Sequence, residues 1–314
     1  MNGQAAAKRS LREWRAKLIN PVLGKEFTLR MRTPRSMWAL FFYLMAIGLL
    51  AFGFLFLIGM DYGFRSGAYD PGRSRTMFLF ISIAQLGLIA FMTPGLTAGV
   101  VSGEREKQTL NLLLVTQQSS TSIILSKLVS SLAFMTLLVV STLPVFSIVF
   151  LYGGISPGQV GTVFAFYLFT MLAFGSFGVM YSTLMKRTML SVITSYGLTV
   201  FLYAGTAFCY LILNLLVESY TSSQASQANP PVIFNWIGFL LMGMNPVAAL
   251  ISIFETDLSD SLFRAGFSGR QAEAPFGLWQ VYFVIYSILA VIAILTSIRH
   301  IRPAPNRKRR RSKG

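Results

Sequence analysis

The chain has 314 residues, of which 54% are hydrophobic and only 12% are charged, whereas a soluble globular domain carries about 25% charged residues. This composition excludes an ordinary soluble protein and predicts an all-α polytopic membrane protein. The formal net charge is +16, and the chain holds one cysteine and one histidine. An intrachain disulfide is therefore excluded, and a zinc site or histidine-based catalysis is disfavoured.

Residues 1–36 are predicted to form a cytoplasmic amphipathic elbow. Nine Lys and Arg residues alternate there with apolar side chains, a pattern that suits a helix lying on an anionic membrane surface. The candidate membrane-surface residues of this segment are Trp14, Lys25, Phe27, Arg30 and Arg32.

Seven apolar runs follow within the predicted transmembrane domain, residues 37–298. A spanning helix needs about 20 mostly apolar residues, and the runs cover roughly 37–60, 76–101, 122–152, 159–185, 189–217, 232–254 and 278–298. If all seven crossed, the basic termini would lie on opposite sides of the membrane, against the positive-inside rule.

Six crossings instead put 22 of the 27 Lys and Arg residues on one face, which predicts a multi-pass protein of the cell membrane with both termini cytoplasmic. The run we exclude is 232–254, because Asn235, Asn245 and Pro246 interrupt it. It is predicted to form a re-entrant hairpin within an outer loop of about 218–277, before the last span and the basic tail, residues 299–314. A seven-span topology is the alternative.

A charged insert, "SGEREKQTLNLLL", separates the second and third runs and begins at Ser102. Each charged residue at the centre of a span costs about 2.5–3.5 kcal/mol, so four in a row must lie outside the bilayer. Leu110, Leu113 and Leu114 recur at helical spacing, and Ser102 is placed to cap a helix. We predict a helix over about 102–118; the alternative is a plain cytoplasmic loop with an amphipathic turn on the bilayer surface.

The longer stretch "GEREKQTLNLLLVTQQSSTSIILSK" resembles the region after the second span in membrane subunits of type-2 ATP-binding-cassette (ABC) exporters. That region combines an acidic and basic cluster, a Thr-Leu pair, a Leu pair and a Lys that opens the next span. The matching residues here are Glu104 and Glu106, Thr109 and Leu110, Leu113 and Leu114, and Lys127. The departures are Gln108 where a Gly is usual, Gln117 where a Pro is common, and Ser126 where a Gly is frequent.

This resemblance implies that the segment is a coupling helix that docks into a groove of an ATP-binding subunit. Glu104, Arg105 and Glu106 would then contact that subunit electrostatically, while Leu110 and Leu113 would pack in its groove. The chain itself has no G-x-x-x-x-G-K-[ST] phosphate cradle, so it is not expected to be an enzyme or to bind a cofactor, and ATP and Mg would be bound by the partner.

The expected partners are an ABC ATP-binding subunit, a second permease subunit that is either identical or a sister chain, and anionic lipids. Nucleic acid is not expected, because attraction to anionic lipid accounts for the basic tail. Gln85, Thr93 and Asn214 are candidates to line a pathway, although polar residues in spans also serve helix packing. Small residues such as Gly175 and Gly178 predict close helix approach.

The predicted function is therefore the permease subunit of an ABC exporter. The alternative is a non-transporting scaffold or a signal-relay subunit associated with an ATPase. An integral membrane enzyme is disfavoured because no convergent catalytic set is visible in the sequence.

Overall fold

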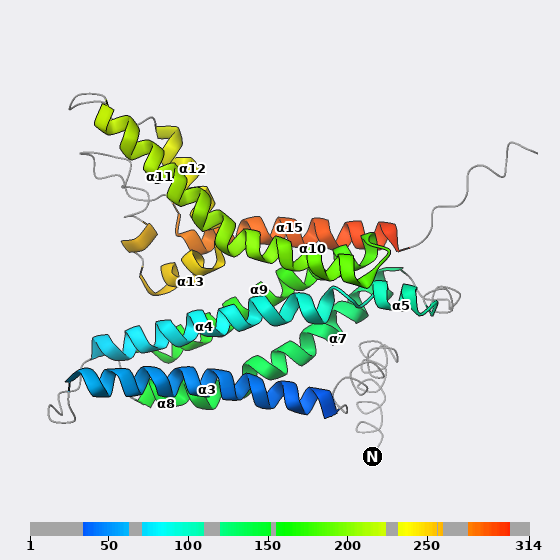
Figure 1. Cartoon of the computed structure of the whole chain (residues 1–314), viewed down its shortest axis with the longest axis horizontal. Helices are drawn as coiled ribbons and strands as arrows, with labels where there is room; N and C mark the ends of the chain where they lie inside the picture. Colours follow the sequence, from blue (N-terminus) through cyan, green and yellow to red (C-terminus); the bar gives the residue numbers. More distant parts are fainter. Residues whose placement is uncertain are drawn as a thin grey trace, which may run out of the picture.

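The computed structural model describes residues 34–62, 71–109, 120–151, 155–223, 232–255, 257–259 and 276–301. Within these ranges every regular element is a helix, and the long helices lie side by side in an elongated bundle (Figure 1). The elbow residues, Leu110, Leu113 and nearly all of the basic tail fall outside the described ranges, so the predictions made for them stay predictions.

Among the described residues, six helical stretches are long and apolar enough to cross a membrane, which confirms the all-helical membrane fold with six candidate spans. Their helices are α3 (Pro34–Tyr62), α4 (Pro71–Thr97), α7 (Ser120–Ser141) with α8 (Leu143–Leu151), α9 (Pro157–Leu184), α10 (Thr188–Val200) with α11 (Thr206–Ser223), and α15 (Leu278–His300). These bounds agree with the predicted runs to within a few residues in most cases, because the need to cover about 30 Å of hydrocarbon fixes the length of each run.

The fifth span is interrupted by a π-helix, η1 (Phe201–Gly205), between α10 and α11. After it comes a bent pair, α12 (Val232–Gly243) and α13 (Pro246–Phe254), whose two arms meet at 94°. The break falls at Asn245 and Pro246, two of the three predicted interruptions, whereas the third, Asn235, lies within α12 and does not interrupt it. Broken spans and re-entrant loops share this geometry, so the described residues hold six candidate spans, or seven if the pair crosses as one.

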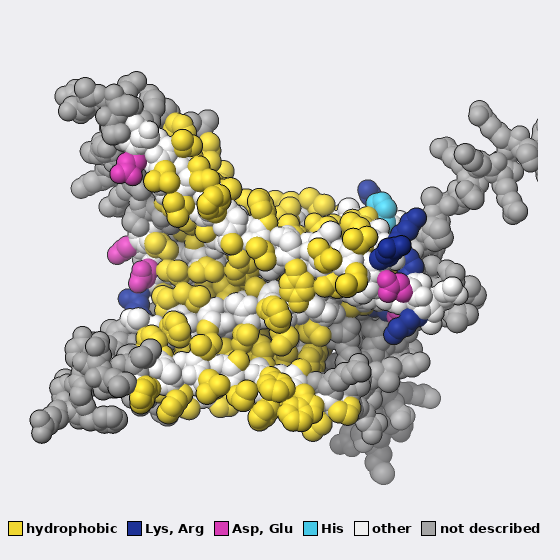
Figure 2. Space-filling view, in the orientation of Figure 1, with side chains coloured by type: hydrophobic (Ala, Val, Ile, Leu, Met, Phe, Trp, Pro, Cys, Tyr) yellow, Lys and Arg dark blue, Asp and Glu magenta, His cyan; other side chains and the backbone are white. Residues whose placement is uncertain are grey.

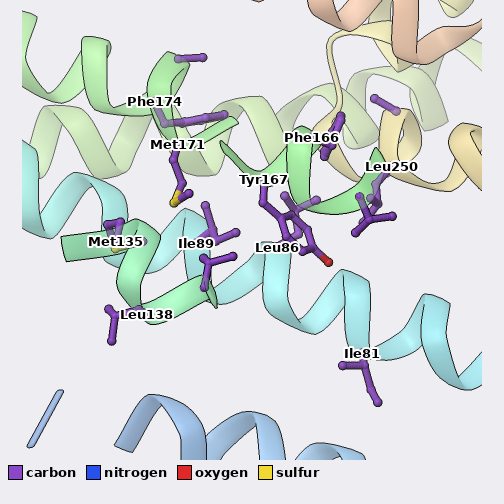
Figure 3. Close-up of a cluster of buried hydrophobic side chains, with 14 of the residues drawn as sticks. Ile81, Leu86, Ile89, Met135, Leu138, Phe166, Tyr167, Met171, Phe174 and Leu250 are labelled. Carbon is purple, nitrogen blue, oxygen red and sulfur yellow. The ribbon is translucent and has the colours of Figure 1, made fainter. Parts of the chain in front are cut away.

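Helix α9 lies at the centre of the bundle, packed against α4, α7, α10 and α15. Its side chains Tyr167 and Met171 lie among residues of α4 and α7 in the buried core (Figure 3), whereas Phe174 packs against the ring of Tyr286 on α15. On the side of α15, the ring of Tyr282 lies 5.0 Å from that of Phe166, centroid to centroid. Aromatic and aliphatic packing around α9 therefore holds the spans together.

The charged residues divide between the two ends of the bundle, with a broad apolar band between them (Figure 2). At the ends of α5, α10 and α15 lie mostly cations, including Arg105, Lys186, Arg187 and Arg299. The opposite end carries mainly carboxylates, from Glu218, Glu255 and Asp257, together with Arg75. We name these the basic end and the acidic end.

Candidate functional site

The charged insert begins as a short helix, α5 (Ser102–Glu106), at the basic end of the bundle (Figure 1). It continues directly from α4 through the turn 98–101, where the amide of Gly103 donates to the carbonyl of Gly99 at 2.9 Å. The predicted cap at Ser102 is therefore wrong. The N-cap position is Val101, in helical conformation, because the preceding turn already supplies acceptors for the first amides.

The end of α5 has the hydrogen bonds of a Schellman motif, in which two amides beyond a helix bond back to its last carbonyls. The amide of Gln108 donates to the carbonyl of Arg105 at 3.1 Å, and that of Thr109 to the carbonyl of Glu104 at 3.0 Å. Gln108 accordingly adopts a φ of 58°, the left-handed region that favours glycine. Gln108, which stands where the resembling family usually has Gly, therefore adopts this conformation at a small energetic cost.

Glu104, the first acidic residue of α5, pairs with Lys127 of α7. Lys127 Nζ donates to Glu104 Oε1, and the lysine side chain is only 3% exposed whereas that of Glu104 is 27% exposed. A buried ammonium needs a compensating anion. The pair therefore joins the beginning of the insert to the third span. Glu104 and Lys127 are also the first acidic residue and the last basic residue of the sequence motif that resembles type-2 exporters.

Arg105 reaches in a different direction, to the carboxyl-terminal end of α9. Its guanidinium donates from Nη2 to the carbonyl of Thr183 at 3.0 Å and from Nη1 to the carbonyl of Met185 at 3.1 Å. The last carbonyls of a helix have no partner within the helix and carry partial negative charge. Arg105 supplies both the donors and the positive charge that this end of α9 needs.

Glu106 completes the set at the amino-terminal end of α10. Its carboxylate accepts from the amide of Thr188 at 2.7 Å and from the Thr188 hydroxyl at 2.8 Å. The N-cap residue of α10, Arg187, makes no side-chain capping bond of its own. Glu106 therefore caps α10 from another segment of the chain, where an anion is favoured by the unpaired amides and the helix dipole.

Uncharged contacts fasten the turn before α5 to α9 and α10. The hydroxyl of Ser182 accepts from the amides of Val101 at 2.8 Å and Ser102 at 3.0 Å, and Ser191 donates to the carbonyl of Ala98 at 2.6 Å. At Gly178 an added Cβ would lie 1.9 Å from Thr97 Oγ1. The predicted close approach at Gly178 is thereby confirmed.

Together these contacts make α5 a junction among three spans. We name Glu104, Arg105 and Glu106 the junction triad; each member holds a different helix, α7, α9 or α10. The sequence located the segment, but the helix predicted over about 102–118 ends at Glu106. The sequence also missed the partners Ser182, Thr188 and Ser191. Serines and threonines at helix ends are common in any bundle, and no sequence signal links them to residues 80 or more positions away.

The remaining predicted site residues are dispersed. Thr109 is exposed and its hydroxyl bonds to the carbonyl of Glu104 at 3.2 Å. Among the pathway candidates, Gln85 and Thr93 are fully buried inside the bundle, whereas Asn214 is exposed on α11. These three residues do not come together in the structure.

A family model described as "ABC-2 family transporter protein" matches residues 21–299, most of the chain and all of the described helices but the very end of α15. No curated protein matches the sequence.

Proposed function

The chain belongs to the ABC-2 transporter family and is a membrane permease of an ABC transporter, and from this premise we propose that it is the exporter subunit driven by a separate ATP-binding subunit through the junction at α5. The family implies an ATP-binding partner. Export, as the direction, follows from the resemblance of the motif to type-2 exporters. The basic end of the bundle is the cytoplasmic end in this proposal, in accordance with the positive-inside rule.

One observation carries the proposal: three consecutive charged residues each hold a different helix. A displacement of α5 would be passed to α7 through Glu104, to the end of α9 through Arg105, and to the start of α10 through Glu106. Interactions with charged groups are among the stronger hydrogen bonds in proteins. A force applied at one short segment would thus reach three spans at once.

The side chains of the triad are already engaged within the chain, so we assign the contact with the ATP-binding subunit to different residues. Lys107, Gln108 and Thr109 are exposed at the tip beyond α5 and would face the partner, together with Leu110 and Leu113. The triad would act behind this surface as positioning residues. A second permease subunit and anionic lipids complete the proposed assembly in the cell membrane.

The test is an ATP-dependent distance measurement in the complex with the cognate ATP-binding subunit, reconstituted in liposomes. Spin labels would replace Leu190 on α10 and Leu295 on α15, both 49% exposed, after the exposed Cys209 is changed to serine. In the otherwise native chain, ATP should shift this distance. The double variant Arg105→Ala/Glu106→Ala should still assemble with the partner but lose the shift.

The control is Arg299→Ala, which removes an exposed cation at the same end without touching the triad. An unchanged ATP-dependent shift in the double variant would show that the junction does not transmit the motion. A shift absent from the native complex, with no transport, would favour the non-transporting scaffold or signal relay.

A further inference from the structure

Among the buried polar side chains of the described residues that have atoms without a hydrogen-bond partner, Tyr43, Ser82 and Gln85 lie together within the apolar core; the others are Glu104, Ser130 and Tyr203. Tyr43 of α3 is 1% exposed, and Ser82 and Gln85 of α4 are 0% exposed. Neither hydroxyl, and neither the oxygen nor the nitrogen of the Gln85 amide, has a hydrogen-bond partner among the described residues. Buried polar atoms are nearly always paired with protein or with ordered water, so these atoms require an explanation.

Other buried hydroxyls on the same helix satisfy themselves. Thr93 donates to the carbonyl of Ile89 at 2.7 Å, and Thr97 to that of Thr93 at 2.7 Å, which is the common arrangement for Ser and Thr inside helices. The hydroxyl of Ser82 makes no such bond to the preceding turn, and the longer amide of Gln85 does not bond to its own helix either. On α4 the unsatisfied atoms are therefore confined to Ser82 and Gln85 and are not a property of the helix as a whole.

The unsatisfied groups lie next to one another where α3, α4 and α9 meet. The hydroxyl of Tyr43 lies beside the side chain of Gln85, close enough for a weak interaction but outside hydrogen-bond geometry. Tyr167 of α9 donates to the carbonyl of Ser82 at 2.9 Å, and its own hydroxyl lies near Tyr43. Figure 3 shows Tyr167 among the apolar side chains of this core.

The cluster is deep in the span. Gln85 lies 12 residues before the end of α4 at Thr97, a rise of about 18 Å along the helix. Bulk water does not reach this depth in the closed bundle, and lipid offers no hydrogen bonds. The compensating partner must therefore be small enough to occupy the interior itself.

We propose that Tyr43, Ser82 and Gln85 form a binding site for water in the middle of the bundle. Two hydroxyls and an amide offer both donors and acceptors, and a buried water typically makes about three hydrogen bonds. All of these groups are neutral, which suits water and gives no charge to bind an ion. Because the three residues are 0–1% exposed, the site is closed to a transported molecule in this conformation, and Gln85 here serves water and not cargo.

Radiolytic labelling of the full chain in lipid nanodiscs, read by mass spectrometry, tests the site directly, because hydroxyl radicals formed from a bound water oxidise the adjacent side chain. Tyr43 should be oxidised several-fold faster than Tyr282, which is equally buried but has its hydroxyl bonded to Thr170 at 3.1 Å. Gln85→Leu should lower the oxidation of Tyr43 to that of Tyr282. Thr93→Val, a change at a self-satisfied hydroxyl on the same helix, should leave it high.

If a variant does not fold, the comparison of Tyr43 with Tyr282 in the native protein is sufficient to test the proposal. Equal oxidation of Tyr43 and Tyr282 in the native chain would overturn it. So would equally rapid oxidation of Phe78, a fully buried ring on α4, because that result would mean that bulk solvent enters the core and no particular site is hydrated. Undiminished oxidation of Tyr43 in folded Gln85→Leu would overturn the assignment of the site to Gln85.

Discussion

The pair between Glu104 and Lys127 predicts unequal costs for removing its two members. Loss of one partner from a buried ion pair costs about 3–5 kcal/mol, whereas exposed pairs contribute about 0–1 kcal/mol. The Lys127 side chain is 3% exposed and that of Glu104 27% exposed. The cost of leaving the lysine unpaired should therefore be that of a buried charge, and the cost of leaving the glutamate unpaired should be smaller.

Glu104→Ala should therefore lower the free energy of unfolding by about 3 kcal/mol, because a buried ammonium loses its carboxylate. Lys127→Met should cost less, about 1–2 kcal/mol, because the Glu104 side chain is 27% exposed and the new side chain suits an apolar site. The remaining cost comes from Glu104 Oε2, which is buried without a hydrogen-bond partner among the described residues. The double variant Glu104→Ala/Lys127→Met should be less destabilised than Glu104→Ala alone, which makes the two effects non-additive by about 2 kcal/mol.

Equilibrium unfolding by steric trapping in bicelles measures these differences, and Lys186→Met, at an exposed cation of the same end, serves as the control with no expected change. Equal costs for the two single variants would show that the pair is solvated as a surface pair. Additive costs in the double variant would show that the two side chains do not stabilise each other, and the reasoning from burial would then be refuted.

Three further substitutions test the backbone geometry and the helix contacts, each by the free energy of unfolding. Gln108→Gly should stabilise the chain by about 1 kcal/mol, because glycine adopts the observed φ of 58° without the cost paid by other residues; an unchanged stability would contradict the Schellman geometry. Gly178→Ala should destabilise by about 1–3 kcal/mol through overpacking against α4, whereas Gly197→Ala, with nothing within 4 Å of the new Cβ, should be tolerated, and equal effects would contradict the close approach. Asn245→Asp should retain the cap of α13 but lose the amide donors to η1 and to α11, at a cost of about 2 kcal/mol; hydrogen exchange of residues 201–206 should rise, and unaltered exchange there would contradict the role of the amide.

The spans were predictable because their physical requirement is simple and local. An apolar run of sufficient length must be a helix in the bilayer, so the predicted last span, 278–298, differs from α15 by two residues at one end. The interruption of the fifth span was not predictable. The sequence of η1, "FLYAG", is as apolar as its surroundings, and its carbonyl at Tyr203 is met by the amide of Asn245 at 2.8 Å, a partner 42 residues further along the chain.

The junction shows the same division between local and distant information. Charge and the cost of burying it located the insert, and the family resemblance predicted its role as a coupling helix. The sequence assigned the charges of Glu104, Arg105 and Glu106 to an outside partner, because a single sequence does not reveal that the compensating groups lie in α7, α9 and α10. In the structure these charges satisfy helix ends and a buried lysine, and in our proposal the contact with the ATP-binding subunit falls to the exposed tip beyond them.

The junction and η1 lie at opposite ends of α10, and this arrangement bears on how a displacement of α5 would move the rest of the fifth span. Glu106 holds the first residue of α10, and α10 is fastened to α4 near this end by Ser191. Thirteen residues later the regular helix gives way to η1, and π-helical turns interrupt the regular i to i−4 hydrogen bonding and can bend a helix. Beyond it, α11 packs on α12 and lies away from the bundle (Figure 1). A displacement of α10 at the junction would therefore be carried rigidly over about 20 Å of helix. The chain would bend at η1, against the hydrogen bond from Asn245 to Tyr203. As a result, α11 and the bent pair would move further than the amino-terminal end of α10.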